Sequence, residues 1–183
     1  MSEGVRLERE FYARHAPVVA PQLLHKVLVV GACAGRIVEV EAYTADDPAS
    51  HTFRGRTPRN ATMFGPPGVL YVYFTYGMHH CANIVTGDPD DGQAVLLRAV
   101  EPLQGIDVMR GRRGGRPYRQ LCDGPGKLCQ AFGLDRSDDG TDLCAHPTAM
   151  VVDDGTPPPA CPVTTGRIGI RNGTDRLWRW LDS

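Results

Sequence analysis

Lysine and long hydrophobic runs are almost missing from this sequence. Of its 20 basic residues only Lys26 and Lys127 are lysines, which leaves 18 arginines. The planar, forked guanidinium of arginine suits phosphate and carboxylate partners. No apolar run approaches the roughly 18 residues that span a membrane, and the charged start, MSEGVRLEREFY, lacks the apolar segment of a signal peptide. We therefore expect a cytoplasmic protein with no membrane partner.

The CxxC motif is also missing: no two of the six cysteines are separated by only two residues. Such pairs are typical of zinc sites and redox centres. A reducing compartment would keep all six as thiols. The sequence thus predicts buried thiols and no bound metal.

A strong net charge is absent too. The 20 basic and 21 acidic residues give a formal charge of -1, which excludes a global basic field for nucleic acid. The distribution is uneven: residues 51–127 hold ten basic and six acidic residues, whereas residues 135–155 hold one arginine and six aspartates. A nearly neutral protein can therefore still present a basic face.

The length and composition indicate one globular domain, residues 1–183. The chain has 42% hydrophobic and 22% charged residues, which is enough apolar surface for one core. No internal repeat or linker divides it. We expect helices within residues 5–25, interrupted at Pro17 and Pro21, and within residues 103–113 and 124–133, followed by a loop-rich stretch over residues 135–162.

Alternating residues predict several strands. Residues 26–30 predict a first strand and residues 36–43, RIVEVEAY, a second. The second has one face made of Ile37, Glu39, Glu41 and Tyr43, and an opposite face made of Val38, Val40 and Ala42. Residues 69–76 and 78–86 predict a hairpin that turns at Gly77, with Tyr76 at its tip. Residues 94–100 predict the next strand, and residues 163–170 and 176–181 predict a final pair.

Four of these strands offer polar side chains that could meet around one pocket. Arg98 lies among Val and Leu in AVLLRAV, so it must be paired if it is buried. A structural ion pair would satisfy it as well as a functional one. Glu41 can equally be a solvent-facing residue of an edge strand, and Asn83 a strand-end amide.

Aromatic and histidine side chains recur near the same positions. Tyr71, Tyr73 and Tyr76 are either core residues or a stacking surface for bases, worth roughly 1–3 kcal/mol per base. His51 is a surface residue, a ligand or a base. His79 and its neighbour on the predicted strand point to opposite faces and cannot chelate one ion. No nucleophile elbow, glycine-rich nucleotide loop or HExxH motif is present.

Five runs occur in one order: RIVEVEAY, SHTFRGRTPRNATMF, GVLYVYFTYGMHHCANIV, AVLLRAVEP and LCDGPGKLCQAFGL. Over residues 7–180 the chain resembles the 3-methyladenine DNA glycosylases of the alkyladenine (N-methylpurine) type. The resemblance implies a compact mixed α/β (α+β) domain around a curved antiparallel sheet, with a protruding β-hairpin and flanking helices. It also implies a monomer that acts on double-stranded DNA in the bacterial cytoplasm without a metal or cofactor.

The implied reaction is the removal of damaged purines, such as 3-methyladenine, 7-methylguanine, hypoxanthine and ethenoadenine. Water, and not a lysine amine, cleaves the N-glycosidic bond and leaves an abasic site. By resemblance, Glu41 is the general base, and Arg98 and the main-chain carbonyl of Ile168 contact the attacking water. Lesions alkylated at N3 or N7 leave readily, whereas hypoxanthine needs an acid that the sequence does not reveal.

The resemblance also assigns residues to the DNA. Those implied to bind the extruded base are Tyr43, His51, Tyr73, Asn83 and Leu96, with Asn83 crowding the 2-amino group of guanine. Those implied to fill the gap or contact the minor groove are Tyr76, Met78 and His79. Those implied to contact phosphates are Arg56 and Lys127, beside an arginine-rich region at residues 110–119. Phosphate contacts position DNA without reading its sequence.

Two departures from the family pattern keep another function open. His79 stands where many members have tyrosine, and the chain stops at Ser183, short of the usual final segment. We therefore expect either a glycosylase or a lesion-binding or RNA-binding module that keeps the fold without useful catalysis. Hydrolysis of free nucleosides is a weaker third alternative.

Overall fold

The computed structural model describes residues 4–75 and 77–182. Its fold is built around one long strand, β3. The strands are β1 (Val5–Arg6), β2 (Val27–Val30), β3 (Cys33–Tyr43), β4 (Leu70–Thr75), β5 (His79–Thr86), β6 (Gln93–Gln104), β7 (Ala149–Asp153), β8 (Val163–Thr165) and β9 (Arg179–Leu181). The α-helices are α1 (Arg9–Tyr12), α2 (Ala16–Leu23), α3 (Ile106–Arg112) and α4 (Pro125–Phe132). Short 3-10 helices are η1 (Ala61–Phe64), η2 (Tyr118–Gln120) and η3 (Arg136–Asp138).

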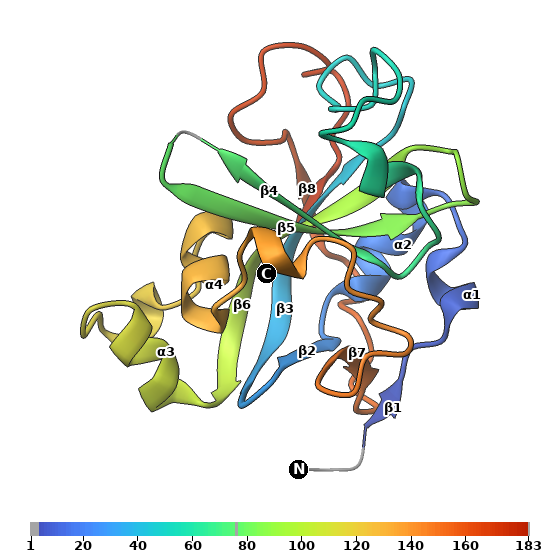
Figure 1. Cartoon of the computed structure of the whole chain (residues 1–183). Helices are drawn as coiled ribbons and strands as arrows, with labels where there is room; N and C mark the ends of the chain where they lie inside the picture. The colour runs from blue at the N-terminus through green and yellow to red at the C-terminus, as the bar shows by residue number, and fades with distance from the viewer. Residues whose placement is uncertain (1–3, 76, 183) are drawn as a thin grey trace.

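The strands form one curled antiparallel sheet in the order β1-β7-β2-β3-β6-β5-β4 (Figure 1). β6 pairs with β3 along one edge. On the opposite edge, β2 pairs with the first half of β3 and β9 pairs with Glu39–Glu41, with β8 outside β9. The predicted fold class, a mixed α/β domain around a curved antiparallel sheet, is confirmed.

Helix α2 covers the sheet from one side and packs on β3 and β6. Its buried residues are Ala16, Val19, Ala20 and Leu23, the spacing of one helix face. The prediction that Pro17 and Pro21 interrupt the helix is wrong. Pro17 lies in the first turn, where no intrahelical N–H bond is needed, and Pro21 lies within a helix that its buried face holds on the core.

Helices α3 and α4 lie together at the left of the molecule in Figure 1, whereas α1 and α2 lie at the right. α4 packs on β5 and β6 through Leu128, Cys129, Ala131 and Phe132. The predicted helix over 103–113 is shorter than expected, because β6 continues through Pro102 to Gln104. Gly105 ends the strand with a φ of 74°, a left-handed conformation that glycine adopts without strain, and α3 starts after it.

The faces of β3 differ from the prediction because the pairing of β3 with β6 is irregular. Ile37 pairs with Val100, Glu39 with Ala99 and Val40 with Leu97, so Val38 and Arg98 have no partner in the ladder. An extra residue reverses the alternation of a strand. Consequently Ile37, and not Val38, shares the core with Val40 and Ala42.

Two predictions for the C-terminal third are also wrong. Residues 149–153, expected in a loop, form β7, which pairs with both β1 and β2. Of the strand expected over 163–170, only Val163–Thr165 pairs with β9. Gly166 and Gly169 interrupt the pattern, and residues 168–170 line a cavity instead of extending the strand.

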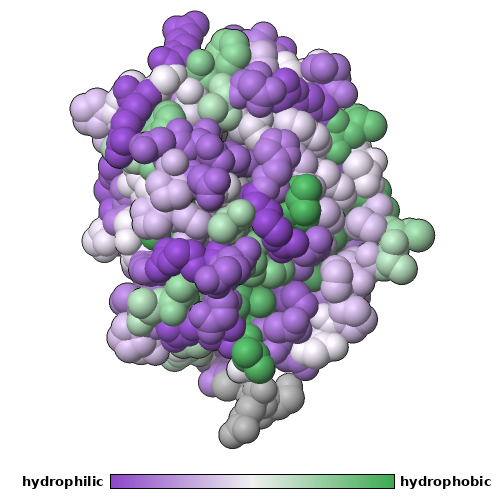
Figure 2. Space-filling model, turned by 90° about the vertical axis from the view of Figure 1, so that its right-hand side faces the viewer, coloured by the Kyte–Doolittle hydropathy of each residue, from purple (hydrophilic) through white to green (hydrophobic). Residues whose placement is uncertain are grey.

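The surface is mostly hydrophilic on the side that carries α1 and α2. Figure 2 shows this side, and its hydrophobic atoms form small separate patches. Single exposed apolar groups of this kind are ordinary on a soluble domain.

Candidate active site

A cavity of about 330 Å³ is lined by residues of β3, β4, β5 and β6 and of the loops beside them. The expected residues that line it are Tyr43, His51, Tyr71, Tyr73, Asn83, Leu96, Arg98 and Ile168. The remaining lining residues are Ala49, Ser50, Met63, Thr75, Cys81, Pro125, Gly169 and Ile170. All four predicted strands thus contribute side chains to one cavity.

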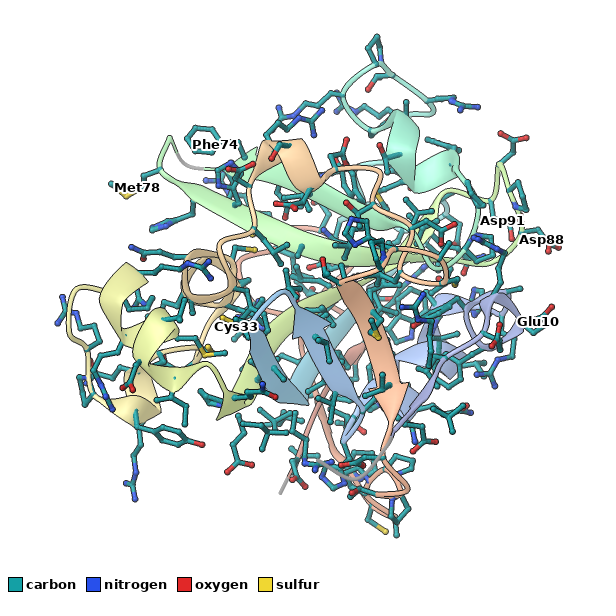
Figure 3. All side chains as sticks on the ribbon, turned by 60° about the horizontal axis from the view of Figure 1, so that its bottom comes forward. Glu10, Cys33, Phe74, Met78, Asp88 and Asp91 are labelled. Atoms are coloured by element: carbon teal, nitrogen blue, oxygen red, sulfur yellow. The ribbon has the colours of Figure 1, made fainter. Side chains whose placement is uncertain are left out.

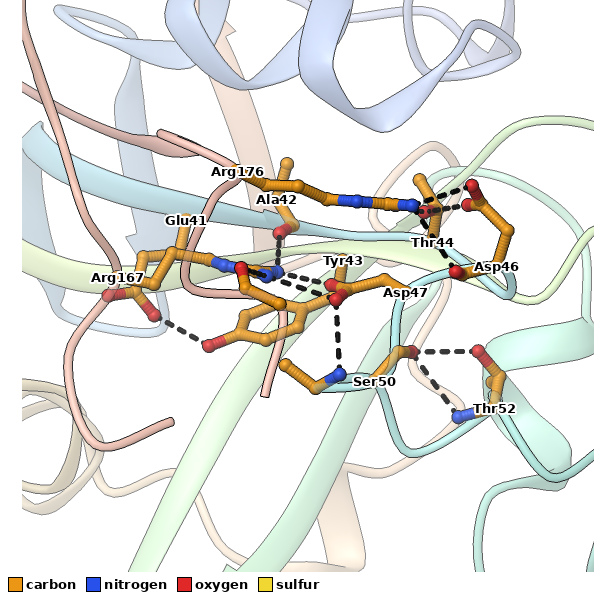
Figure 4. A network of polar contacts seen from close by, with 12 residues as sticks. Glu41, Ala42, Tyr43, Thr44, Asp46, Asp47, Ser50, Thr52, Arg167 and Arg176 are labelled. Carbon is orange, nitrogen blue, oxygen red and sulfur yellow. Dashed lines mark hydrogen bonds and ion pairs between the residues drawn. The ribbon is translucent and has the colours of Figure 1, made fainter. Parts of the chain in front are cut away.

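Glu41 lies directly behind this lining and is fully buried. Its Oε1 accepts a 2.8 Å hydrogen bond from the backbone N–H of Ile168 and lies 3.4 Å from Nη1 of Arg98. Its Oε2 accepts a 2.8 Å hydrogen bond from the Tyr43 hydroxyl (Figure 4). The alternative of a solvent-facing Glu41 on an edge strand is wrong, because strands flank β3 on both sides.

The hydroxyl of Tyr43 stays a donor to this carboxylate. Burial, the charge of Glu41 and the hydrogen bond to it raise the pKa of Tyr43 well above its usual value. The same tyrosine therefore provides a ring to the cavity and a proton donor to Glu41.

Arg98 occupies the irregular position of β6, and its guanidinium joins two carboxylates. Its Nε donates a 2.8 Å hydrogen bond to Oε1 of Glu39, while Nη1 faces Glu41. Arg179 of β9 donates a 2.6 Å hydrogen bond to the same Glu39 oxygen. β-bulges commonly re-aim a side chain next to an active site. Both interpretations of Arg98 therefore hold. Its ion pair with Glu39 is structural, and its second carboxylate partner, Glu41, lies directly behind the cavity lining.

The second wall of the cavity is aromatic. The rings of His51 and Tyr73 lie 4.5 Å apart between centroids, and those of Tyr71 and Tyr73 lie 5.4 Å apart. Nδ1 of His51 lies 3.1 Å from the Tyr71 hydroxyl oxygen. Burial lowers the pKa of His51, and the positive charge of Arg59 lowers it further. Burial raises the pKa of Tyr71 to about 12. This wall is consequently uncharged at neutral pH.

Tyr71 fits the core reading better than the stacking reading. It is 1% exposed and packs in a small cluster with Met63, Val69, Val85 and Ala94. Tyr73 packs against this cluster only partly buried, so its ring is available to the cavity.

Asn83 and Leu96 are cross-strand partners on the floor of the cavity. Asn83 is buried, and its Nδ2 donates a 3.2 Å hydrogen bond to the backbone oxygen of Tyr71. This bond fixes the orientation of the amide. Leu96 pairs on its other side with Glu41, which places the floor next to the carboxylate.

The predicted hairpin is present, and its end projects from the molecule (Figure 3). Met78 is 70% exposed there, and Phe74 is 46% exposed. His79 packs on Gly126 at the start of α4, where an added methyl group would lie 3.0 Å from its Cγ. Tyr76, the expected tip, lies outside the described residues.

The two expected phosphate contacts are exposed and already paired. Nη1 of Arg56 lies 3.0 Å from Asp90, and Nζ of Lys127 lies 3.0 Å from Asp123. Either cation must exchange its carboxylate partner to bind a phosphate. Such exposed pairs are weak, so an exchange costs little.

Besides the unexpected lining residues, the sequence did not reveal three charged residues that lie beside the cavity. Glu39 anchors Arg98, and Arg167 and Asp47 form a fully buried ion pair beside Tyr43 (Figure 4). The position of Glu39, two residues before Glu41, was the one available signal for it. Asp47 and Arg167 are 120 residues apart, and nothing in either local sequence indicates their contact.

All six cysteines are free, and the prediction of buried thiols is confirmed for Cys33, Cys81, Cys122 and Cys129. It is wrong for Cys144, which is partly exposed, and for Cys161, which is exposed. Within residues 4–75 and 77–182, no three His, Cys, Asp or Glu side chains are grouped so that they could share a metal ion. In the same residues, no helix is long and apolar enough to cross a membrane.

The sequence is similar to those of known proteins over nearly its whole length. The sequence model described as methylpurine-DNA glycosylase matches residues 10–183. A protein of Burkholderia lata is 58% identical over 181 residues, with 97% of this chain and 87% of the relative covered. A protein of Agrobacterium fabrum is 50% identical, over 94% of this chain and 86% of the relative. A protein of Rhodopseudomonas palustris is 47% identical, with 97% of this chain and 87% of the relative covered.

Each of these three relatives is provisionally named a 3-methyladenine DNA glycosylase. The chain is a DNA glycosylase, an enzyme that hydrolyses N-glycosyl bonds and therefore binds DNA. It belongs to the methylpurine-DNA glycosylase family.

Proposed function

We propose that this enzyme excises alkylated and deaminated purines, among them 3-methyladenine, 7-methylguanine, hypoxanthine and ethenoadenine, from double-stranded DNA. It would act as a monomer on the chromosome in the bacterial cytoplasm. The observation that carries the proposal is the buried carboxylate of Glu41, held by three residues that line a cavity with aromatic walls. A buried carboxylate beside an aromatic cavity fits the hydrolysis of a bond to a flat base.

Base flipping supplies the access that this cavity needs. An enzyme cannot reach a glycosidic bond inside a stacked duplex, so the nucleotide rotates out at a cost of a few kcal/mol. Tyr43 on one side and His51 with Tyr73 on the other would stack on the flipped base and offset that cost. Tyr76, Met78 and His79 at the hairpin would fill the gap and contact the minor groove.

Glu41 is proposed to act as general base. It accepts a proton from water as the water oxygen attacks C1′, and the C1′–N bond breaks with its electron pair going to the base. Its charge also favours an oxocarbenium-like sugar. Arg98 and the carbonyl of Ile168 would hold the water. A base alkylated at N3 or N7 leaves as a neutral molecule, whereas hypoxanthine must gain a proton on departure.

Selectivity and positioning fall to other residues. The fixed amide of Asn83 would crowd the 2-amino group of guanine and exclude the normal base. Arg56 and Lys127 would contact phosphates, which sets position but not sequence. A module that binds lesions without excising them, and an enzyme that hydrolyses free nucleosides, are outcomes of the following test.

The test is a single-turnover assay on a duplex with one hypoxanthine or ethenoadenine, with alkylated DNA in parallel. Free base and alkali-labile sites are measured for the native protein and Glu41→Gln. We expect the native protein to release base, and the variant to bind but excise roughly 10²–10⁴ times more slowly. Excision by Glu41→Gln at the native rate would refute the mechanism. Binding without release by the native protein would support the binding module, and turnover of a free modified nucleoside the third function.

A further inference from the structure

A fully buried ion pair lies directly behind the Tyr43 side of the cavity. Nη1 and Nη2 of Arg167 each donate to one carboxylate oxygen of Asp47, and both side chains are 0% exposed. Nη1 also donates to the backbone oxygen of Ala42 at 2.9 Å, and Nη2 to that of Gly173 at 3.0 Å. One guanidinium thus joins the end of β3, the loop that follows it and the loop between β8 and β9 (Figure 4).

Arg167 is linked to two groups of the proposed active site, to one by its guanidinium and to the other through the next residue of the chain. Its central carbon lies 4.7 Å from the centre of the Tyr43 ring and covers that ring. The next residue, Ile168, donates its N–H to Glu41. The position of Arg167 therefore sets both the ring against which a base would stack and one hydrogen bond to the carboxylate.

Stability is a weak reason for this arrangement. Removing two charges from water is expensive, and apolar residues of similar volume often stabilise a core as well or better. Nε of Arg167 is buried and has no hydrogen-bond partner among the described residues, which adds to the cost. The arrangement needs a purpose that apolar packing could not serve.

We infer that Arg167 is a positioning residue of the glycosylase reaction, held by Asp47. It fixes the ring of Tyr43 by direct contact and the carboxylate of Glu41 through Ile168, so that base and water meet in one geometry. This inference rests on the proposed role of Glu41 as general base. Misplacement by about 1 Å can cost roughly 10²-fold in rate, which makes such a role measurable.

Gly173 offers a way to disturb the pair without altering a charge. An added methyl group there would lie 2.6 Å from Oδ1 of Asp47 and 3.0 Å from Nη2 of Arg167. The φ of Gly173 is +65°, so alanine also strains the backbone. Gly155 has a φ of +87° with no atom within 4 Å of an added methyl group. Gly155→Ala is therefore the matched control for Gly173→Ala.

A second variant, the double change Asp47→Asn with Arg167→Met, removes both charges together, which avoids leaving one unpaired. Its control is Arg36→Met, which breaks another arginine–aspartate pair, with Asp154, at β3. We expect Arg36→Met to lower thermal stability and to leave excision unchanged.

The assay measures the single-turnover excision of hypoxanthine, the Kd for a duplex with a tetrahydrofuran abasic analogue, and thermal unfolding. Gly173→Ala and the double variant should each excise roughly 10²-fold more slowly. The Kd should change less than about threefold, since phosphate contacts are untouched. Loss of rate without loss of affinity separates positioning from a general loss of folding.

The pH profile gives a readout that a merely structural role would not move. The groups that face Glu41 are Arg98 of β6, Tyr43 of its own strand, Cys81 of β5 and the N–H of Ile168. Losing the Ile168 bond removes stabilisation of the charged carboxylate. The acidic limb of the excision rate should therefore move to higher pH in both variants and stay in place in Gly155→Ala and Arg36→Met.

The outcomes separate this inference from the proposed function. If Glu41→Gln is inactive while Gly173→Ala and the double variant keep the native rate and pH profile, the inference about Arg167 is overturned and the proposed function stands. If Glu41→Gln excises at the native rate, the proposed function fails first. Should the double variant not fold, Gly173→Ala against Gly155→Ala decides the question.

Discussion

Arg98 donates a 2.8 Å hydrogen bond from Nε to Oε1 of Glu39, so its orientation is set from the side away from the cavity. Arg179 binds the same oxygen and completes a bridge between β6, β3 and β9. With Nε engaged, Nη1 of Arg98 faces Glu41 at 3.4 Å. Glu39 therefore determines where the positive charge of the site lies.

Replacing Glu39 by glutamine tests this bridge. The amide keeps the size of the side chain but removes the carboxylate that Arg98 and Arg179 share, so the free energy of unfolding should fall by roughly 1–3 kcal/mol. The excision rate should fall about tenfold, because a displaced Arg98 costs part of the geometric advantage. Urea unfolding and single-turnover excision measure the two effects. Glu101→Gln, an exposed glutamate of β6, is the control, and an unchanged rate in Glu39→Gln would contradict the prediction.

Tyr43→Phe separates the two uses of this tyrosine. The variant keeps the ring and loses the 2.8 Å bond to Oε2 of Glu41. Hydrogen bonds to a charged group are worth roughly 1.5–3 kcal/mol, so the charged carboxylate becomes less favourable. The acidic limb of the excision rate should move to higher pH, with little change in Kd for the abasic duplex. Tyr118→Phe, which loses a hydroxyl bonded to Pro102 instead, should show no shift.

Arg56 and Asp90 give a test of the DNA interface. If Arg56 contacts a phosphate, Arg56→Ala should lower the slope of log affinity against log salt by about one. Asp90→Asn should raise affinity roughly two- to fivefold, because an exposed ion pair holds Arg56 by about 0.2–1 kcal/mol. Fluorescence anisotropy over a salt series measures both. Glu10→Gln, the same charge change on α1, should leave affinity unchanged, and an equal gain there would assign the effect to net charge.

His25 predicts a pH-dependent stability. Its Nε2 lies 2.8 Å from Asp182, and Nδ1 lies 2.7 Å from the carbonyl oxygen of Pro157. Both partners are acceptors, so both ring nitrogens must carry protons. The hydrogen bond to Asp182 raises the pKa of His25, and the bond to Pro157 adds to this against the opposing effect of burial.

Because the folded pKa is above the unfolded one, this stabilisation is fully present below the unfolded pKa and is lost as pH rises through the folded pKa. The native protein should therefore lose roughly 0.2–1 kcal/mol more than His25→Asn between pH 5.5 and pH 9. Asparagine tolerates the positive φ of 68° at this position. If the difference in unfolding free energy between the two proteins, measured by urea unfolding, is the same at every pH, the ion pair does not contribute and the prediction is wrong.

The sequence was most informative where a side chain contradicts its surroundings. Arg98 among aliphatic residues, and Glu41 beside Tyr43 on a strand, indicated a polar site on a sheet. The hairpin followed from β-branched and aromatic runs on both sides of Gly77. These signals are local, and a local pattern predicts the structure of one helix or strand.

The rest depended on contacts between distant residues. β7 lies between glycine- and proline-rich segments, and it is a strand because β1 and β2 pair with it. Ile168 looked like part of a strand, yet its N–H bonds to Glu41, 127 residues earlier. The roles assigned to single residues by resemblance stay predictions until the variants are measured.

The unpaired residues of β3 and β6 have a consequence for how these strands can change in length. Val38 and Arg98 offset each other, so residues 35–37 and 40–43 of β3 pair with β6 in the same register. Deleting Val38 alone would slide one strand by a residue and turn its side chains to the opposite face. Deleting both would leave residues 35–43 of β3 in one continuous register with β6 and would remove the guanidinium that faces Glu41. Such a paired deletion would keep the pairing of the two strands and the other side chains of the proposed site.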